Sequence, residues 1–582
     1  MNVFQEFRDT VAAAVAALQK RGELPTALDL GRISVEPPRD PAHGHMATNA
    51  ALVLAREARC KPLELAALLR QEIESAPEIV AVEVAPPGFL NVRLSDDLWR
   101  RQIPAVLRAG ADYGRCDLGR GQPVNDEYCS ANPTGPLHVG HGRGTVYGDA
   151  LANLLDFAGY RVTREYYVND GGAQIEAMAR SIHHRYRELL GEDPGPMPEG
   201  LYPLEELVPV ARAILERDGD RWLGRPEEEW LELFGREGVE AMLARIREDL
   251  AALGVHHDVF VSERELIAAG RIEEAISFLE KQGLVYVGTL PPPKGKQMED
   301  WEPTPQLLFK STAFGDDIDR PLKRSNGAWT YFAADLAYHL DKIRRGAEVL
   351  IDVWGADHGG YVKRMQAAVK ALGEGRAELV VKLCQLVRLY AGGEPLKMSK
   401  RAGRIIWLRD VVEEVGKDVF RFIMLTRKND APLEFDLEKV VEQSKDNPVF
   451  YVQYAHARIC SVFRNATEAG LPTDPEALAG APLEGLRDPA ELELIRQMAG
   501  WPRLVEGAAR SFEPHRIAFY LHDLASAFHA LWTRGKEEPG LRFLIGAEPG
   551  LTTARLAMLA AVRIVIANGL RLMGVTPVEE MH

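Results

Sequence analysis

The sequence predicts a multidomain protein of α/β and all-α structure: a Rossmann-like parallel-sheet domain with a helical insertion, an N-terminal α/β domain and a C-terminal helical bundle. Three observations lead to this prediction. Apolar extended runs end in turns that open helices at 124–155 and 348–360. The chain has 582 residues, more than one hydrophobic core supports. Residues 442–582 contain long Ala/Leu-rich amphipathic segments, which are typical of a helix bundle.

Residues 1–110 form the predicted N-terminal domain. Apolar residues recur at helical spacing over 4–20 and 47–75. They alternate with polar residues, as in strands, over 33–37, 79–85 and 89–94. Phe89 with the nearby Asn91 would suit stacking on and hydrogen bonding to an unpaired base. A core position in a turn and strand is an equal alternative for Phe89.

Residues 111–173 form the predicted first half of the parallel-sheet domain. A short strand at 124–129 ends at the Asn-Pro-Thr-Gly-Pro turn, after which apolar residues recur at helical spacing to 155. His138 and His141 therefore lie at a helix N-terminus, where the free N–H groups attract anions and the dipole favours neutral, hydrogen-bond-donating imidazoles. The turn predicts a phosphate site. On this stretch alone, a helix-capping turn with two half-exposed histidines is the alternative.

The predicted insertion occupies 174–262, and the second half of the sheet domain occupies 263–403. An apolar run at 348–354 predicts a strand buried on both faces, and Asp357 and His358 follow it. Ligands of open parallel sheets bind at the carboxyl ends of the strands, so we expect Asp357 to bind ribose hydroxyls and His358 to contact the nucleotide. An Asx turn that caps the next helix is the alternative.

A second phosphate element is predicted in the Lys-Met-Ser-Lys loop, which follows an apolar run and two glycines, a pattern that predicts a hairpin. Its candidate residues are Lys397, Ser399 and Lys400. As a bare basic loop it would be a solvated charge cluster. A connecting helical region at 404–441 and the bundle at 442–582 complete the chain.

Composition narrows the class of protein. Hydrophobic residues make up 46% and charged residues 27% of the chain, as in ordinary soluble globular proteins. The formal charge is −15, so a polyanion would have to bind through local basic patches. The five cysteines show no metal-binding spacing, and we expect neither structural zinc nor disulfides. No apolar run approaches the length of a membrane span, so we expect a cytoplasmic enzyme with no membrane partner.

The His-Val-Gly-His turn at 138–141, followed by Lys-Met-Ser-Lys at 397–400, resembles the signature of class I aminoacyl-tRNA synthetases. In that class the two elements close over the triphosphate of ATP. The resemblance implies Mg²⁺ and ATP as cofactors. It also implies catalytic roles for His138, His141, Lys397 and Lys400. The implied ATP contacts are Gly140, Asp357, His358 and Ser399.

Tyr331 and Asp335 indicate which amino acid is activated. They are four residues apart and share one face if the segment is helical. A guanidinium is a planar fork that pairs best with a carboxylate, and a phenol adds a further contact. Asp335 is therefore the predicted partner of an arginine side chain. Taken singly, such a pair more often marks a half-buried helix edge.

In order and over nearly its full length, the chain resembles bacterial arginyl-tRNA synthetases; the matching segments are 130–141, 314–317, 331–339, 355–358 and 447–458. The resemblance implies an arginine–tRNA ligase that forms arginyl-adenylate from L-arginine and ATP and transfers arginine to the 3′-terminal ribose of tRNA(Arg), releasing AMP and pyrophosphate. It implies a tRNA-dependent first step, and we expect a monomer. The implied arginine contacts are Glu127, Asn132, Tyr331 and Asp335. The implied tRNA contacts are Phe89, Asn91, Gln453, Tyr454 and Arg458.

Two features depart from the family pattern: Lys400 is retained where many members lack it, and Gly359 replaces the second histidine of the usual Gly-Ala-Asp-His-His turn. Three other functions stay open. Another class I synthetase, such as one for glutamate, would need Arg or Lys at the position of Asp335 to bind an anionic side chain. A small-molecule nucleotidyltransferase would not need an RNA-sized helical bundle. A non-catalytic tRNA-binding relative would have lost the motif residues, which this chain keeps.

Overall fold

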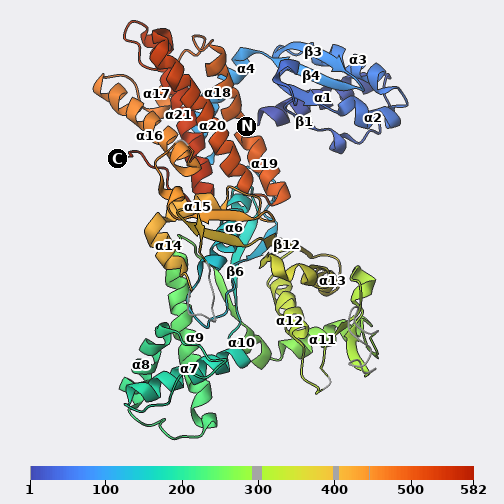
Figure 1. The fold of residues 1–582 in the computed structure, drawn as a ribbon. Coiled ribbons are helices and arrows are strands. Elements are labelled where there is room, and N and C mark those ends of the chain that lie inside the picture. Colours follow the sequence, from blue (N-terminus) through green and yellow to red (C-terminus); the bar gives the residue numbers. More distant parts are fainter. Residues whose placement is uncertain (1, 291–303, 325, 397–404, 445, 582) are drawn as a thin grey trace.

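The computed structural model describes residues 2–290, 304–324, 326–396, 405–444 and 446–581. A five-stranded sheet lies near the middle of the molecule (Figure 1). The N-terminal domain and the C-terminal helices lie toward one end of the molecule, and the helices between β6 and β7 lie toward the other. The predicted combination of α/β domains and an all-α bundle is confirmed.

The central sheet is parallel throughout, with strand order β12-β11-β5-β6-β7. From β5 the chain passes through α6 (Val139–Phe157) to β6 on one side, and it later reaches β11 on the other side of β5. The strand order therefore reverses between β5 and β11, as the Rossmann-like prediction requires. The strands are β5 (Pro123–Glu127), β6 (Arg161–Val168), β7 (Val259–Ser262), β11 (Val349–Gly355) and β12 (Glu378–Cys384).

Strand β11 is apolar because both of its faces are covered. Leu350 packs in a cluster with α12 (Tyr331–Arg344) and α13 (Val362–Leu372), while its neighbour Ile351 packs in the cluster that contains α6. Successive side chains of a strand point to opposite faces, so helices on both sides favour a nearly continuous apolar run, which Asp352 interrupts.

The N-terminal domain is an antiparallel sheet of order β1-β2-β4-β3 with helices beside it. The strands predicted at 79–85 and 89–94 are confirmed. The helix predicted over 47–75 is wrong as one element, because Arg59 with φ +54° ends α2 and Pro62 begins α3. The elements are α1 (Val3–Lys20), β1 (Val35–Glu36), β2 (Met46–Thr48), α2 (Ala50–Ala58), α3 (Pro62–Ile73), β3 (Ile79–Ala85) and β4 (Phe89–Leu94), followed by α4 (Asp96–Arg100) and α5 (Gln102–Ala109).

The helices predicted between β6 and β7 are confirmed and share a hydrophobic cluster of their own: α7 (Ala173–Leu189), α8 (Val208–Asp218) and α9 (Glu227–Ala252). The range 174–262 also includes β7, which pairs with β6 and completes the central sheet. A small antiparallel sheet after α10 (Glu263–Ala268) and α11 (Arg271–Lys281) was not predicted. Its strands are β8 (Val285–Gly288), β9 (Gln306–Phe309) and β10 (Arg320–Pro321).

The predicted hairpin before the Lys-Met-Ser-Lys loop is confirmed as β13 (Val387–Ala391) and β14 (Glu394–Pro395). Strand β15 (Leu433–Asp436) pairs with β13 in parallel. Two short helices, α14 (Leu408–Val415) and α15 (Lys417–Met424), lead toward the bundle. The bundle helices are α16 (Pro448–Glu468), α17 (Pro475–Ala479), α18 (Pro489–Ala499), α19 (Trp501–Ser511), α20 (His515–Glu537) and α21 (Pro549–Leu572).

Helix α21 is long and apolar enough, by length and composition alone, to cross a membrane. The expectation that no apolar run reaches that length was therefore wrong. In the structure, 72% of its most apolar window is buried, and the helix packs against α16 and α20. Such burial is typical of the core helix of a bundle.

Arg421 of α15 joins several parts of the chain through one buried guanidinium. It pairs with Asp149 of α6, and its Nη1 donates to the Leu253 carbonyl beyond α9 at 3.0 Å. Its Nε donates to the Met573 carbonyl beyond α21 at 2.8 Å. The ends of the insertion and of the bundle therefore meet α6 at one residue.

Gly148 and Gly144 give a matched test of the packing of α6. A Cβ at Gly148 would lie 2.2 Å from Cγ of Tyr128, whereas the nearest atom to a Cβ at Gly144 is Cγ1 of Val353 at 3.8 Å. Gly148→Ala should therefore destabilise the protein by about 1–3 kcal/mol through overpacking. Gly144→Ala should stabilise it by about 0.5–1 kcal/mol, because alanine favours the helix. Thermal unfolding measures both, and equal midpoints would contradict the predicted contact.

Candidate active site

The histidine turn lies at the carboxyl end of β5, as predicted. His138 is the N-cap of α6 and stacks on His141 with the ring centroids 3.7 Å apart. The Gly140 N–H donates to Nδ1 of His138 at 3.1 Å, and the His138 N–H donates to Nδ1 of His141 at 3.2 Å. Because each Nδ1 accepts a bond, a neutral ring carries its proton on Nε2. Both rings are thus arranged as neutral donors through Nε2–H.

The segment after the Lys-Met-Ser-Lys loop pairs with the backbone of this turn. The Val139 N–H donates to the Ile406 carbonyl at 3.1 Å, and the Leu408 N–H donates to the Leu137 carbonyl at 2.8 Å. Lys397, Ser399 and Lys400 themselves lie outside the described residues. The pairing brings the end of their loop beside the histidine turn, although the two are far apart in the sequence.

Arg143, one turn into α6, bonds to backbone carbonyls that lie before and after the loop in the sequence, just ahead of the paired strands β13 and β15. Its Nη1 donates to the carbonyls of Gln385 and Ala431 at 3.1 and 2.7 Å, and its Nη2 donates to that of Lys428 at 2.8 Å. Sequence reasoning missed this residue, because a single arginine in a helix carries no signal of distant carbonyl partners.

Asp357 and His358 follow β11 in the 3₁₀ turn Ala356–Tyr361, on the other side of the point where the strand order reverses. Their side chains are 81% and 63% exposed, and His358 Nε2 lies 3.6 Å from a carboxylate oxygen of Asp357. No side chain caps α13, whose N-cap is Tyr361, so the alternative of an Asx cap does not hold. Both side chains are available to a ligand.

Asp335 and Tyr331 lie on the first turns of α12, four residues apart, as predicted. Tyr331 is 73% exposed, whereas Asp335 is largely buried and accepts a bond from Oη of Tyr361 at 2.5 Å. Burial raises the pKa of Asp335 to about 6, and the bond from Tyr361 opposes this rise. Among the described residues Asp335 has no ion-pair partner, so its position favours a cationic ligand.

Glu127 and Asn132, the other two predicted arginine contacts, already have partners in the protein. Oε2 of Glu127 accepts from Nζ of Lys342 at 2.6 Å, and its Oε1 accepts from Oγ of Ser130 at 2.9 Å. Asn132 is exposed, and its amide donates to Gln174 of α7 at 2.7 Å. The sequence reasoning did not anticipate the buried lysine.

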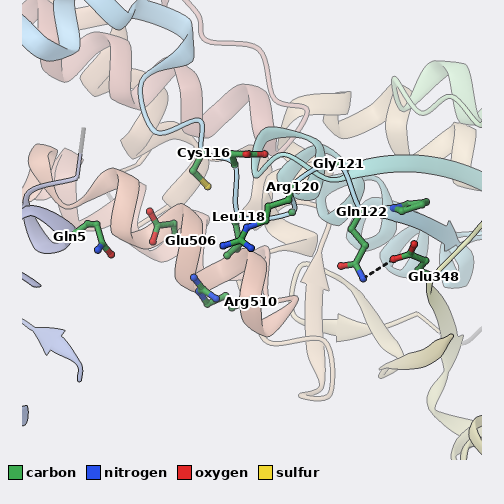
Figure 2. Close-up of a pocket in the computed structure, with 12 residues that line it drawn as sticks. Gln5, Cys116, Leu118, Arg120, Gly121, Gln122, Glu348, Glu506 and Arg510 are labelled. Atoms are coloured by element: carbon green, nitrogen blue, oxygen red, sulfur yellow. Dashed lines mark hydrogen bonds between the residues drawn. The ribbon is translucent and has the colours of Figure 1, made fainter. Parts of the chain in front are cut away.

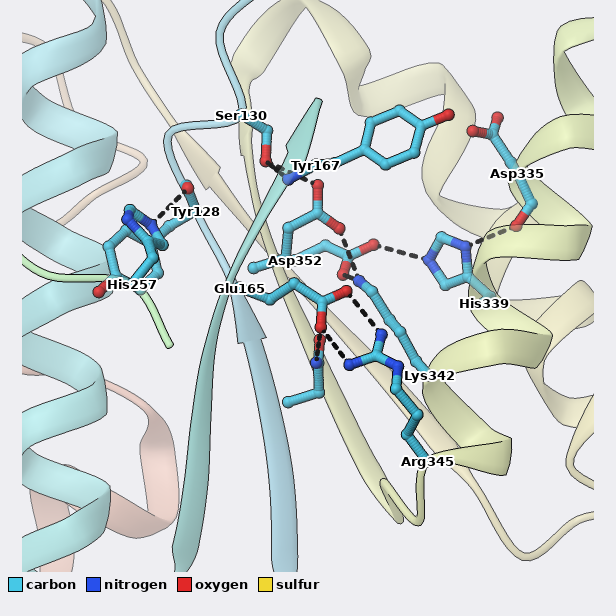
Figure 3. Close-up of polar contacts among 12 residues, drawn as sticks. Tyr128, Ser130, Glu165, Tyr167, His257, Asp335, His339, Lys342, Arg345 and Asp352 are labelled. Atoms are coloured by element: carbon cyan, nitrogen blue, oxygen red, sulfur yellow. Dashed lines mark hydrogen bonds and ion pairs between the residues drawn. The ribbon is translucent and has the colours of Figure 1, made fainter. Parts of the chain in front are cut away.

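Lys342 belongs to a chain of buried polar contacts between α12 and the sheet (Figure 3). Its Nζ also donates to Asp352 of β11 at 2.9 Å, and Asp352 contacts Nε2 of His339 at 2.9 Å. The only signals in the sequence were an aspartate within an apolar strand and the spacing of Asp335, His339 and Lys342, which places them on one helical face.

The predicted tRNA contacts differ in their exposure. Phe89 is 39% exposed, but Asn91 is buried within the N-terminal sheet. Gln453 is also buried and donates to the Thr576 carbonyl at 3.3 Å, so packing rather than exposure accounts for its position. Tyr454 and Arg458 are half-buried, with the guanidinium carbon 4.0 Å from the ring centroid.

A polar cleft of about 770 Å³ lies away from these residues (Figure 2). It is lined by Pro123 at the start of β5, by Glu348 just before β11, and by Gln5 and Arg510 from α1 and α19. It is therefore at the amino ends of the strands. Ligands of open parallel sheets bind at the opposite edge, so this cleft is not the candidate active site.

Comparisons with known proteins agree along the whole chain. Three family models match: "Arginyl tRNA synthetase N terminal domain" over residues 5–94, "tRNA synthetases class I (R), catalytic domain" over 102–195, and "DALR anticodon binding domain" over 452–581. The arginine–tRNA ligases of Paracoccus denitrificans and Ruegeria pomeroyi are 58% and 57% identical over 582 residues, with full coverage of both chains. The Thermus thermophilus arginyl-tRNA synthetase structure has a TM-score of 0.75 at 23% identity, with full coverage of both chains.

The fold and the histidine turn are those of a class I aminoacyl-tRNA synthetase, an enzyme class that uses ATP. Within this class, the identity and coverage of the relatives leave no ambiguity about the amino acid. The chain belongs to the arginine–tRNA ligases, which attach arginine to tRNA(Arg). The other class I synthetases, the nucleotidyltransferase and the non-catalytic relative are thereby set aside.

Proposed function

We propose that the carboxyl edge of the central sheet holds arginine and ATP side by side. The observation that carries this assignment is Asp335, a partly buried carboxylate with no ion-pair partner among the described residues. A guanidinium would supply the missing charge and two parallel donors. Glu127, Asn132 and Tyr331 complete the proposed arginine site, since they come from the end of β5, the turn after it and the start of α12.

ATP is assigned to the neighbouring wall of the same edge. His138 and His141 donate through Nε2–H to phosphate oxygens, and Gly140 keeps the start of α6 open, because a Cβ there would lie 2.9 Å from the His138 ring. Asp357 and His358 contact the nucleoside. Lys397, Ser399 and Lys400 hold the pyrophosphate, an assignment that rests on their sequence motif.

The proposed reaction needs no nucleophile from the protein. An α-carboxylate oxygen of arginine attacks the α-phosphorus of ATP, the bond from that phosphorus to the bridging oxygen breaks, and pyrophosphate leaves. A ribose hydroxyl at the 3′ end of tRNA then attacks the adenylate carbonyl, and AMP leaves. Positioning and stabilisation of the charge on the phosphate oxygens lower the barrier to the first step.

Mg²⁺ is proposed to enter with ATP. Among the described residues, no three His, Cys, Asp or Glu side chains are grouped as metal ligands. Mg²⁺ in nucleotide sites is held largely by phosphates and water, with one or two carboxylates, so the chain does not need such a group. We assign no protein ligand to it.

We propose a monomeric cytoplasmic enzyme with no membrane partner, and domain limits at residues 110, 173, 262, 403 and 441. For tRNA, Phe89 of the N-terminal domain and Tyr454 and Arg458 of the bundle remain the proposed contacts, because their side chains reach the surface. Aromatic rings and guanidinium groups at a surface suit stacking on unpaired bases.

We further propose that adenylate formation requires bound tRNA. ATP–pyrophosphate exchange with arginine should then be near background without RNA and should rise when tRNA(Arg) is added. A tRNA whose 3′-terminal ribose has been oxidised is a useful second addition, because it binds without being charged. Robust exchange with arginine alone would contradict the proposal.

Asp335→Asn tests the arginine pocket. Loss of a buried charge-assisted pair costs about 3 kcal/mol or more, so KM for arginine should rise roughly 100-fold while KM for ATP changes little. Because the pKa of Asp335 is raised to about 6, the carboxyl is protonated below that pH and cannot pair with the guanidinium. In the parent enzyme, kcat/KM for arginine should therefore fall as pH decreases through about 6, and Asp335→Asn should lack this limb. An unchanged KM would remove Asp335 from the pocket.

His141→Ala tests the role of the histidine turn. It should lower kcat for adenylate formation about 10²- to 10³-fold with little change in KM for ATP, because the Nε2–H donor acts on charge that develops in the transition state. His141→Gln, whose amide can place a donor near Nε2, is the matched variant and should retain more activity. A loss of ATP affinity without loss of kcat would argue against this role.

A further inference from the structure

Glu127 and Asp335 stand at the two ends of one buried chain of contacts. Lys342 bonds to Glu127 and Asp352, Asp352 bonds to His339, and Nδ1 of His339 lies 2.8 Å from the backbone carbonyl of Asp335. The side chains of Lys342, His339 and Asp352 are at most 4% exposed. Figure 3 shows these side chains between the helix and the strands.

His339 is a cation in this arrangement. Its two ring nitrogens face a backbone carbonyl and a carboxylate, both of which accept, so both nitrogens must carry protons. Burial lowers the pKa of His339, but the Asp352 carboxylate more than offsets this, and the net pKa is raised. The chain thus contains three carboxylates, Glu127, Asp335 and Asp352, and two cations, His339 and Lys342.

One negative charge is therefore left over, and it falls on Asp335. Asp352 bonds to both cations, and Glu127 bonds to Lys342, whereas within the described part of the chain the Asp335 carboxylate accepts a hydrogen bond only from the neutral Tyr361 hydroxyl. Glu165 on the neighbouring strand has its own bidentate partner in Arg345. A ligand with one positive charge would bring this chain to neutrality.

We infer that Lys342 is a positioning and specificity-determining residue of the arginine site: it keeps Glu127 ionised and oriented, and with His339 it leaves one carboxylate uncompensated. The inference rests on the proposed arginine pocket. In this role Lys342 does not touch the substrate, because it acts through Glu127 and Asp352. Without it, two neighbouring buried carboxylates would face each other, and Glu127 would take up a proton and lose its value as an acceptor for the guanidinium.

The test is a charge-balance cycle of Lys342→Met, Asp352→Asn and the double variant. Lys342→Met removes one positive charge and Asp352→Asn removes one negative charge, and the double change removes both members of this ion pair. Each single variant should raise KM for arginine about tenfold or more while KM for ATP stays within about twofold. The double variant should recover KM for arginine to within about threefold of the parent.

Arg345→Met is the matched control. It removes a cation from just beyond the same helix and breaks the pair with Glu165, which lies opposite Glu127 on β6 but, among the described residues, forms no hydrogen bond with the Glu127 or Asp335 carboxylate. It should lower the unfolding temperature but leave KM for arginine within about twofold. An equal rise of KM for arginine in Arg345→Met and Lys342→Met would overturn the inference, because any damage to the sheet would then suffice.

The result is decided even if Lys342→Met does not fold. Removing both members of a buried ion pair is often tolerated, so the double variant is then compared with Asp352→Asn alone. A lower KM for arginine in the double variant supports the inference, and an equal or higher KM overturns it. Asp335→Asn distinguishes failure of the arginine pocket from failure of the role of Lys342. If Asp335→Asn raises KM for arginine while the effects of Lys342→Met and Asp352→Asn simply add in the double variant, the pocket is supported and the role of Lys342 is refuted. If Asp335→Asn leaves KM for arginine unchanged, the pocket itself is refuted.

Discussion

The backbone pairing of residues 137–139 with 406–408 is the interaction on which the proposed nucleotide site depends. The two segments are separated by the insertion, the second half of the sheet and the hairpin before the loop. Main-chain bonds fix the register between them regardless of side chains, and Arg143 adds three bonds to carbonyls near the same hairpin. In the proposed nucleotide site, residues 406–408 are therefore held in a fixed position beside the histidine turn.

The second constraint is electrostatic. Parallel strands place their carboxyl ends at one edge, and here β5 and β11 bring Glu127 and Asp352 into register on neighbouring strands. Two adjacent buried carboxylates repel and favour protonation unless cations are supplied. Helix α12 supplies them from one face, through His339 and Lys342, and the same face carries Asp335 at its solvent end. In the proposed arginine site, α12 therefore both pairs with the buried carboxylates of the strands and carries the carboxylate that would face the substrate.

Much of this architecture was accessible from the sequence, and the misses have physical reasons. The parallel sheet followed from apolar runs that end in polar turns, and the histidine turn followed from the change of spacing after Pro136. The break between α2 and α3 was missed because apolar spacing continues through Arg59, whose left-handed conformation is set by the local chain. The buried position of Gln453 was missed because its partner, Thr576, lies more than a hundred residues away. Hydrogen bonds of that kind leave no periodic pattern in the sequence.

Arg421 shows how distant domains can be held to the active site by a single group. Its guanidinium bonds to α6 through Asp149 and to carbonyls at the ends of the insertion and of the bundle. A Cβ at Gly574, directly after that last carbonyl, would collide with the guanidinium at 2.2 Å, so the turn must be glycine for α21 to approach. Any shift of the bundle that broke these bonds would leave a buried charge unpaired, at a cost of several kcal/mol. The helix that begins with the histidine turn is therefore anchored at its middle to the region that matches the DALR anticodon binding domain model.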